Sequence, residues 1–150
     1  MTTKTKVSIG GSTAAAAVGL DPFRSRVQLW LELTGRVEPP DTSEAMRWGT
    51  LLEPVIAAEI DKTVEYNVLR PGQQLVDGWR HANTDGTVDD GYGPLGVLEI
   101  KTASAYRSRE WADAAVPTAY VIQVSHYMAL TGLTWGLVAC LIGGQRLELR

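Results

Sequence analysis

The sequence has little of what most metal-binding and disulfide-bonded proteins depend on. It contains one cysteine, Cys140, and two histidines, His81 and His126. A single cysteine forms no internal disulfide, and zinc sites and iron–sulfur clusters need several ligands of this kind. We therefore expect no iron–sulfur cluster and no histidine-based metal site, so that any metal must be bound by carboxylates. The apolar neighbours of Cys140 predict a buried strand position.

Long hydrophobic runs are absent as well. Apolar stretches such as residues 137–142 are far shorter than the roughly 20 residues that cross a bilayer, so we expect no membrane span. The N-terminal segment has no apolar signal-peptide core, which predicts a cytoplasmic protein. The content of 45% hydrophobic and 21% charged residues is that of an ordinary folded protein. The length of 150 residues predicts a single domain over 1–150.

A strong net charge is the third feature that the chain lacks. Its formal charge of −3 argues against a protein that coats nucleic acid through a general positive charge. The distribution is nevertheless uneven, because residues 51–100 carry nine acidic and three basic side chains. This pattern fits a carboxylate site between basic edges, although a solvated acidic face would give the same composition. The basic edges include Lys4, Lys6, Arg24, Arg26, Arg107 and Arg109.

The spacing of apolar residues predicts helices, then a group of strands, then helices and a final hairpin. Helices are expected near residues 12–19, 27–35, 43–60, 106–113 and 117–131. Strands are expected near residues 64–69, 74–76, 79–83, 97–102, 135–142 and 146–149. Ser12 is the predicted cap of the first helix, and Pro54 predicts a kink in the third helix or a late start near Gly49. This order predicts an α/β or α+β fold with a central mixed sheet covered by the 43–60 and 117–131 helices.

The most informative segment is a short strand in which an acid and an amine alternate with apolar residues. Positions two apart on a strand share a face, so Glu99 and Lys101 should lie side by side while Leu98 and Ile100 face the other way. A surface ion pair on a half-exposed strand would show the same alternation. A hairpin would also bring Asp85 next to Glu99. Two adjacent carboxylates repel each other unless a proton or a cation such as Mg²⁺ lies between them.

Three further polar residues extend this set. Glu53, in the predicted 43–60 helix, would supply a third carboxylate, although an isolated glutamate is more often a solvent-facing residue. Gln123 and Tyr127 lie four positions apart and share a helix face, with His126 beside them. Each of these residues alone is equally compatible with a polar position at the edge of the core.

Five segments together resemble a known family in their order along the chain. They are Gly10-Gly11-Ser12, residues 46–54, Asp85-Gly86, Glu99-Ile100-Lys101 and residues 123–127. The same order is found in YqaJ-type viral recombinases, which are phage exonucleases related to lambda exonuclease within the PD-(D/E)XK nuclease superfamily. The resemblance runs from about residue 9 to residue 144. It implies the restriction-endonuclease-like fold of that superfamily, a central mixed β-sheet flanked by helices.

The resemblance implies a catalytic role for the charged residues. Asp85 and Glu99, with the main-chain carbonyl of Ile100, would bind a catalytic Mg²⁺, for which Mn²⁺ can substitute. Glu53 would hold the metal directly or through water. Lys101 would orient the attacking water and stabilise charge on the phosphate.

The remaining matches concern the edge of the active site and the DNA. Gln123 and Tyr127 correspond to the family's Gln-x-x-x-Tyr motif, with Gln123 assigned to catalysis and Tyr127 to DNA binding. Ser12 matches a serine that helps to hold the 5′-phosphate in lambda exonuclease. The arginine that precedes this serine in the lambda enzyme is missing here. Lys4 or Lys6 would replace it, with Lys6 named as a DNA-binding residue, and Arg24 is a further candidate DNA-binding residue.

These roles imply a metal-dependent exonuclease that acts on the ends of linear double-stranded DNA, from 5′ to 3′, in phage-type recombination. The implied partners are the DNA, a single-strand annealing protein and other copies of the chain in a homo-oligomer, in a phage-infected or lysogenic bacterial host. Two alternatives remain open. A catalytically inactive DNA-binding relative is disfavoured because Asp85, Glu99 and Lys101 are all present. Another nuclease of the superfamily, such as a resolvase or a restriction-type endonuclease, is the second.

Overall fold

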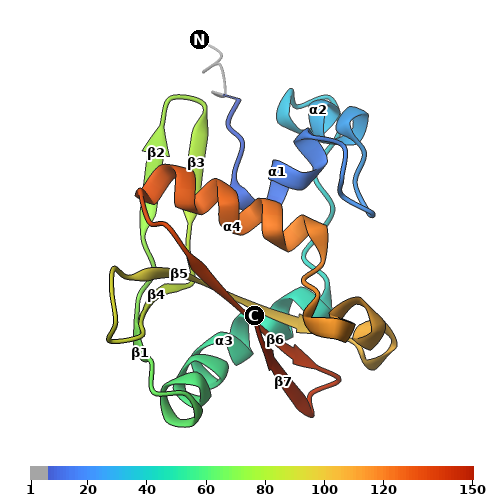
Figure 1. Cartoon of the computed structure of the whole chain (residues 1–150). Helices are drawn as coiled ribbons and strands as arrows, with labels where there is room; N and C mark the ends of the chain where they lie inside the picture. Colours follow the sequence, from blue (N-terminus) through green and yellow to red (C-terminus); the bar gives the residue numbers. More distant parts are fainter. Residues whose placement is uncertain (1–6) are drawn as a thin grey trace.

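The computed structural model describes residues 7–150, which form a five-stranded sheet with helices on both faces (Figure 1). In order across the sheet, the strands are β1 (Asn67–Leu69), β4 (Gly86–Asp89), β5 (Gly96–Ala103), β6 (Gly136–Ile142) and β7 (Arg146–Leu149). The β5 and β6 strands are parallel, and the other neighbouring pairs in this sheet are antiparallel. The predicted central mixed sheet is therefore confirmed.

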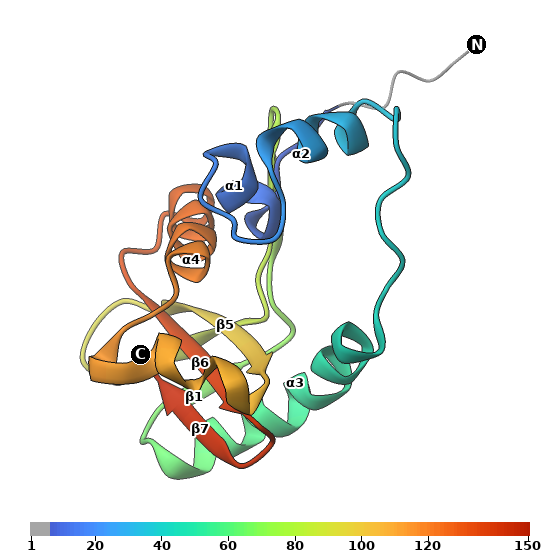
Figure 2. The same cartoon turned by 90° about the vertical axis from the view of Figure 1, so that its right-hand side faces the viewer.

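The two long helices cover opposite faces of the sheet, as Figure 2 shows. One is α3 (Glu44–Thr63), and the other is α4 (Thr118–Thr131). The short α1 helix (Gly11–Ala17) packs mainly on α4, and α2 (Arg26–Leu33) packs on α1. The prediction of the covering helices is thus confirmed. No helix within residues 7–150 is long and apolar enough to cross a bilayer.

The start of α3 differs from one of its two predicted positions. The helix begins directly after Ser43, whose hydroxyl accepts a hydrogen bond from the Met46 amide at 3.2 Å. The late start near Gly49 is therefore wrong, because the Ser43 cap satisfies a free amide of the first turn well before that point. Pro54 lies inside this continuous helix.

The start of α1 also differs from the prediction. The cap residue is Gly10, and Ser12 is the second residue of the helix, so the prediction of a Ser12 cap is wrong. The Thr13 hydroxyl closes the first turn instead, since it accepts from the Gly10 amide and donates to the Gly10 carbonyl, each at 3.0 Å. Pairing of Ile9 with Arg80 holds the preceding segment on strand β3 (Arg80–Asn83), so the helix starts two residues earlier than expected.

Two segments lie outside this arrangement of sheet and long helices. The β2 (Gln74–Asp77) and β3 (Arg80–Asn83) strands form a separate antiparallel ribbon. Residues Ala105–Ala114, labelled η1, connect β5 to α4 as a 3₁₀ helix rather than the predicted regular helix. Asp113 and Ala114 have φ of 53° and 61°, a left-handed conformation that interrupts a right-handed helix.

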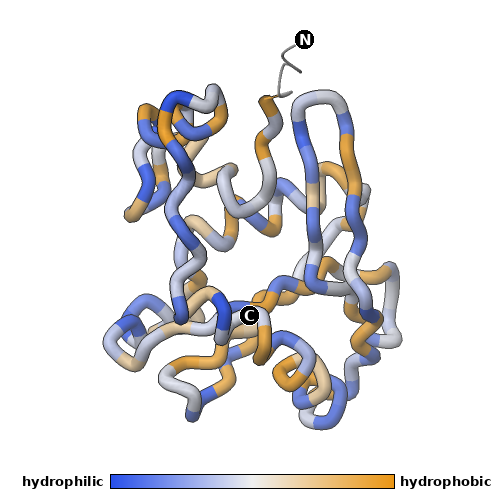
Figure 3. The backbone as a smooth tube through the Cα atoms, turned by 180° about the vertical axis from the view of Figure 1, so that it is seen from behind, coloured by the Kyte–Doolittle hydropathy of each residue, from blue (hydrophilic) through white to orange (hydrophobic). Residues whose placement is uncertain are grey.

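The core has two layers because successive residues of β5 face opposite sides of the sheet. Leu98 packs with α3 residues such as Ile60, whereas Val97 packs with α4 residues such as Val124. Cys140 on β6 is completely buried, which confirms its predicted position. Figure 3 shows apolar and hydrophilic stretches alternating along α3, as expected for a helix with one buried face. The central strands are thereby fixed from both sides.

Candidate active site

Strand pairing brings the predicted acidic residues together. Gly86 of β4 lies opposite Leu98 of β5, so Asp85, directly before β4, reaches the neighbourhood of Glu99. The Asp85 carboxylate accepts a hydrogen bond from the Ile100 amide at 2.7 Å. The predicted hairpin between the Asp85 segment and β5 is confirmed by this register.

These residues open into a cavity of about 260 Å³. It is formed by α1, α3, β3, β5, α4 and the turn before β4. Of the nine predicted site residues that the structure describes, eight line it. The full lining consists of Gly11, Ser12, Glu53, His81, Asn83, Asp85, Glu99, Ile100, Lys101, Gln123 and Tyr127.

Glu99 is held at the centre of a polar network. Its Oε1 atom accepts hydrogen bonds from Lys101 Nζ at 2.5 Å and from Gln123 Nε2 at 2.6 Å. Gln123 Nε2 also donates to the Tyr127 hydroxyl at 2.9 Å, as expected for residues that share a helix face. The Glu99 residue is only 2% exposed, so the interpretation as a half-exposed surface ion pair is wrong.

The second carboxylate oxygen of Glu99, Oε2, is buried and has no hydrogen-bond partner within the described part of the chain. Burial raises the pKa of Glu99 to about 7, against the opposing charge of Lys101 and with the help of the negative charges of Asp85 and Glu53. A buried, unpartnered oxygen is costly unless a proton or a cation satisfies it. The site is therefore built to receive positive charge at this point.

The other charged groups share this electrostatic environment. Burial raises the pKa of Asp85, and burial together with the charge of Asp85 raises the pKa of Glu53. Glu53 Oε2 lies 3.5 Å from Arg70 Nη2. Burial lowers the pKa of Lys101, but the charge of Glu99 and their hydrogen bond outweigh it, so the net shift is upward. Lys101 therefore keeps its positive charge inside the cavity.

The acidic residues of the cavity offer donor atoms that suit a divalent cation, but their side chains are not arranged around a common point. Among residues 7–150, no group of three or more Asp, Glu, His or Cys side chains forms a ready metal-binding cluster. Glu53 is turned toward Arg70, and one oxygen of Glu99 is taken up by Lys101. The donor atoms of these acidic residues are all oxygens, which Mg²⁺ and Mn²⁺ prefer, and the unpartnered Oε2 of Glu99 is among them.

The Gly10-Gly11 segment explains how α1 comes so close to this cavity. A Cβ atom at Gly10 would lie 2.3 Å from Nε2 of His81, and one at Gly11 would lie 2.3 Å from Cε1 of Tyr127. Only glycine allows the backbone to touch both rings without displacing them. Ser12 is thereby placed at the edge of the cavity, where it is exposed.

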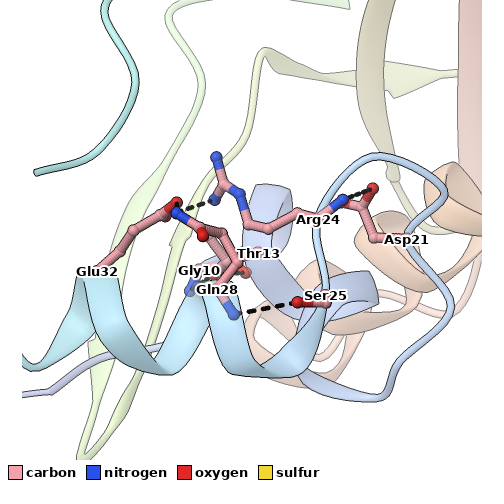
Figure 4. A network of polar contacts seen from close by, with 7 residues as sticks. All are labelled: Gly10, Thr13, Asp21, Arg24, Ser25, Gln28 and Glu32. Atoms are coloured by element: carbon pink, nitrogen blue, oxygen red, sulfur yellow. Dashed lines mark hydrogen bonds and ion pairs between the residues drawn. The ribbon is translucent and has the colours of Figure 1, made fainter. Parts of the chain in front are cut away.

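One of the predicted DNA-binding residues that the structure describes, Arg24, is not in the cavity. Lys6 lies outside the described residues. The Arg24 guanidinium is directed to α2, where it pairs with Glu32 at 3.5 Å (Figure 4). Arg24 therefore belongs to the contact between α2 and the loop before it.

Three residues of the site were missed by sequence reasoning. His81 and Asn83 line the cavity, and they alternate with Asp85 along the chain, so strand periodicity could have identified them. His81 is fixed by a hydrogen bond between its Nδ1 atom and the Ser8 hydroxyl at 2.7 Å. Arg70, the partner of Glu53, follows β1, and no sequence pattern indicated it.

Comparison with known protein families identifies the family to which the chain belongs. Residues 3–134 match the model of the YqaJ-like viral recombinase domain. The chain belongs to this family. The uncharacterized protein YqaJ of Bacillus subtilis (strain 168) is 36% identical over 148 residues, which cover 92% of this chain and 44% of that protein. The chain thus spans less than half the length of this curated relative.

Solved structures show the same fold. An alkaline exonuclease (LHK-Exo) from Laribacter hongkongensis is similar with a TM-score of 0.72 and 23% identity, over 97% of this chain and 77% of that one. The structure of LHK-Exo in complex with dAMP matches with a TM-score of 0.69 and 22% identity, over the same shares of 97% and 77%. The predicted PD-(D/E)XK restriction-endonuclease-like fold is confirmed.

Proposed function

We propose that this domain is a metal-dependent DNA exonuclease that hydrolyses phosphodiester bonds at the ends of linear double-stranded DNA, from 5′ to 3′. The observation that carries the proposal is the cavity in which Asp85, Glu53 and the buried Glu99 meet the charged amine of Lys101. The family membership supports it. The related fold of LHK-Exo, an alkaline exonuclease described in complex with dAMP, agrees with a nucleotide-sized product.

In this proposal, Asp85, Glu99, Glu53 and the main-chain carbonyl of Ile100 hold Mg²⁺ or Mn²⁺. When bound, such an ion supplies Lewis acidity at the phosphate and lowers the pKa of water. The Ile100 amide positions the Asp85 carboxylate, to which it donates at 2.7 Å. Arg70 neutralises part of the charge of Glu53, from which it lies 3.5 Å away.

Lys101 and Gln123 act on the groups that react. The Lys101 amine orients the attacking water and stabilises the negative charge that develops on the phosphate. Gln123 holds Oε1 of Glu99 at 2.6 Å and so keeps the carboxylate in a single orientation. The Tyr127 hydroxyl accepts from the same amide group and fixes it in turn. Such pre-organised groups stabilise a transition state without reorganisation during the reaction.

The proposal extends to the DNA end and to the biological setting. Ser12 is exposed at the edge of the cavity, which suits contact with a 5′-phosphate. The family description supports a role in phage-type recombination. In that setting the proposed partners are a single-strand annealing protein and further copies of this chain.

End-labelled DNA tests this function. Linear duplex labelled at either the 5′ or the 3′ end is incubated with the protein and Mg²⁺, Mn²⁺ or EDTA. We expect early release of labelled mononucleotide from the 5′ label with either metal, late release from the 3′ label and none in EDTA. A covalently closed circle is the matched substrate and should stay intact.

Two results would contradict the proposed exonuclease function, and each would favour a different alternative. Cleavage of the circle as fast as the linear duplex would favour a resolvase or a restriction-type endonuclease. DNA binding without hydrolysis in either metal would favour a catalytically inactive relative.

A further inference from the structure

A second cavity, of about 500 Å³, adjoins the catalytic one. Both are lined by Gly11, Ser12, Lys101 and Gln123, so a single ligand can extend from one into the other. Its volume lies within the range of about 300–1,000 Å³ that is common for small-molecule sites. The walls outside the shared region come from the loop after α1, from η1 and from the start of α4, and include Leu20, Pro22, Phe23, Arg107, Pro117 and Tyr120.

Aromatic rings and cations line this space together. The Arg107 guanidinium lies 5.2 Å from the centre of the Phe23 ring, and Lys101 Nζ lies 5.2 Å from the centre of the Tyr120 ring. Tyr120 is backed by the buried Trp111, with 5.9 Å between ring centres. Phe23, by contrast, is 80% exposed. An exposed aromatic ring in the wall of a cavity is a surface that a flat apolar ligand can cover.

The groups that present these rings are held in place. The Asp21 carboxylate accepts hydrogen bonds from the amides of Phe23 at 2.7 Å and Arg24 at 3.1 Å, which closes the loop that carries Phe23. Glu110 accepts two hydrogen bonds from the Arg107 guanidinium, at 2.9 and 2.6 Å. The cavity wall is therefore formed before any ligand arrives, which lowers the cost of ordering on binding.

We infer that this aromatic pocket, defined by Phe23, Arg107 and Tyr120, binds the nucleobase of the nucleotide next to the scissile phosphate. The inference rests on the proposed function and adds a base-binding subsite to it. The phosphate occupies the catalytic cavity, and the base stacks on Phe23 in the adjoining pocket. Stacking on a ring tolerates every base because each has a π-face, so the pocket suits an enzyme that degrades DNA of any sequence.

Nucleotide binding tests the pocket directly. The affinities of dAMP, dTMP and 2-deoxyribose 5-phosphate are measured by calorimetry in Mg²⁺. Both nucleotides should bind about tenfold more tightly than the sugar phosphate, as expected for one stacked base. Phe23→Ala should reduce both nucleotides to the affinity of the sugar phosphate, whereas Phe23→Trp should keep the preference. Val76→Ala, at a residue 78% exposed on β2 and outside both cavities, is the matched control and should change nothing.

Each contrary result has a definite meaning. Equal affinity of the parent protein for nucleotides and sugar phosphate, no binding of either, or a preference that survives in Phe23→Ala would overturn the pocket. Failure of the proposed function shows in a separate measurement, the hydrolysis of linear duplex. If the protein prefers nucleotides through Phe23 but does not hydrolyse DNA, the base-binding pocket is supported and the proposed nuclease activity is refuted.

Discussion

The two carboxylate oxygens of Glu99 have different environments. One oxygen is bound by Lys101 and Gln123, and the other is buried without a partner in the described residues. The first oxygen fixes the orientation of the carboxylate, and the second leaves it able to accept a cation. Glu53 differs from it, because that carboxylate is partly exposed and paired with Arg70. The two residues should therefore respond differently to substitution.

Glu53→Gln keeps the shape of the side chain and removes its charge. We expect Mn²⁺ affinity to fall by about tenfold, because one anionic oxygen donor near the metal is lost. Stability should change by no more than about 1 kcal/mol, since the ion pair with Arg70 is partly exposed. Calorimetric titration and thermal unfolding measure the two effects. Glu65→Gln, at an exposed residue outside the cavity, is the control. Identical titration midpoints for Glu53→Gln and the parent would remove Glu53 from the metal site.

Ser12→Ala addresses recognition of the DNA end. Ser12 is not the cap of α1, so its loss should leave folding intact. Cleavage of 5′-phosphorylated ends should fall by about tenfold, which corresponds to one hydrogen bond to a charged group, while cleavage of 5′-hydroxyl ends stays the same. Initial rates on the two duplexes measure this. Ser125→Ala, at an exposed position of α4, is the control. If the parent cleaves both end types at one rate, Ser12 has no such role.

At the scale of elements, the contact between α1 and α4 closes the site. It depends on the absence of a side chain at Gly11, where a Cβ would lie 2.3 Å from the buried Tyr127 ring. The hydroxyl of Tyr127 in turn accepts a hydrogen bond from Gln123, which also donates to Glu99. A displacement of α1 would therefore be transmitted to the Glu99 carboxylate through Tyr127 and Gln123 of α4.

Gly11→Ala should destabilise the protein by about 1–3 kcal/mol, because an added methyl group in a packed contact forces its neighbours to shift. Cleavage should fall as well, since the hydrogen bonds of Gln123 are disturbed. Urea unfolding and initial cleavage rates measure both effects. Gly93→Ala is the matched control: no atom lies within 4 Å of the added Cβ, and stability should change by no more than about 0.5 kcal/mol. Equal stabilities of the two variants would contradict the role given to this contact.

The sequence alone was sufficient for part of this arrangement. A period of two places Glu99 and Lys101 on one face of a strand, and a period near 3.6 places Gln123 and Tyr127 on one face of a helix. Both pairs are in contact in the structure. Burial of Glu99 could not be predicted, because it depends on α1 and α4 lying over the strand. The surface-pair interpretation of Glu99 failed for this reason.

Other features depended on contacts between distant parts of the chain. The cap of α1 shifted to Gly10 because Ile9 pairs with β3, a long-range contact that no local pattern contains. Arg70 meets Glu53 only because the end of β1 folds back toward α3. The pocket beside the candidate active site likewise brings the loop that carries Phe23 together with Arg107 and Tyr120, which are far away in the sequence.

For the molecule as a whole, the buried acids make stability depend on pH. Burial raises the pKa of Glu99 to about 7 in the folded protein, from the ordinary value of 4.5 for an exposed glutamate. Between these values the folded state binds more protons than the unfolded state, so the unfolding free energy falls as pH rises through this window. Asp85 and Glu53 shift in the same direction. In EDTA, Glu99 contributes a loss of up to about 3 kcal/mol between pH 4.5 and pH 7.

Urea unfolding at pH 5, 6, 7 and 8 measures this dependence. Saturating Mg²⁺ should reduce or reverse the loss, because the metal binds the deprotonated acids. Glu99→Gln, which cannot titrate, should show a smaller loss than the parent in EDTA. A parent protein whose unfolding free energy rises from pH 5 to pH 7 in EDTA, with no difference from Glu99→Gln, would contradict the assigned burial.

The central claim is that one carboxylate cluster performs hydrolysis, and the rate of nucleotide release from linear duplex in Mg²⁺ tests it most directly. The rate is compared among the parent, Asp85→Ala, Glu99→Ala and the double variant. Because both residues serve the same metal and the same phosphate, each single variant and the double variant should fall to nearly the same background rate. If either single variant keeps most of the parent's rate, the cluster is not the hydrolytic centre.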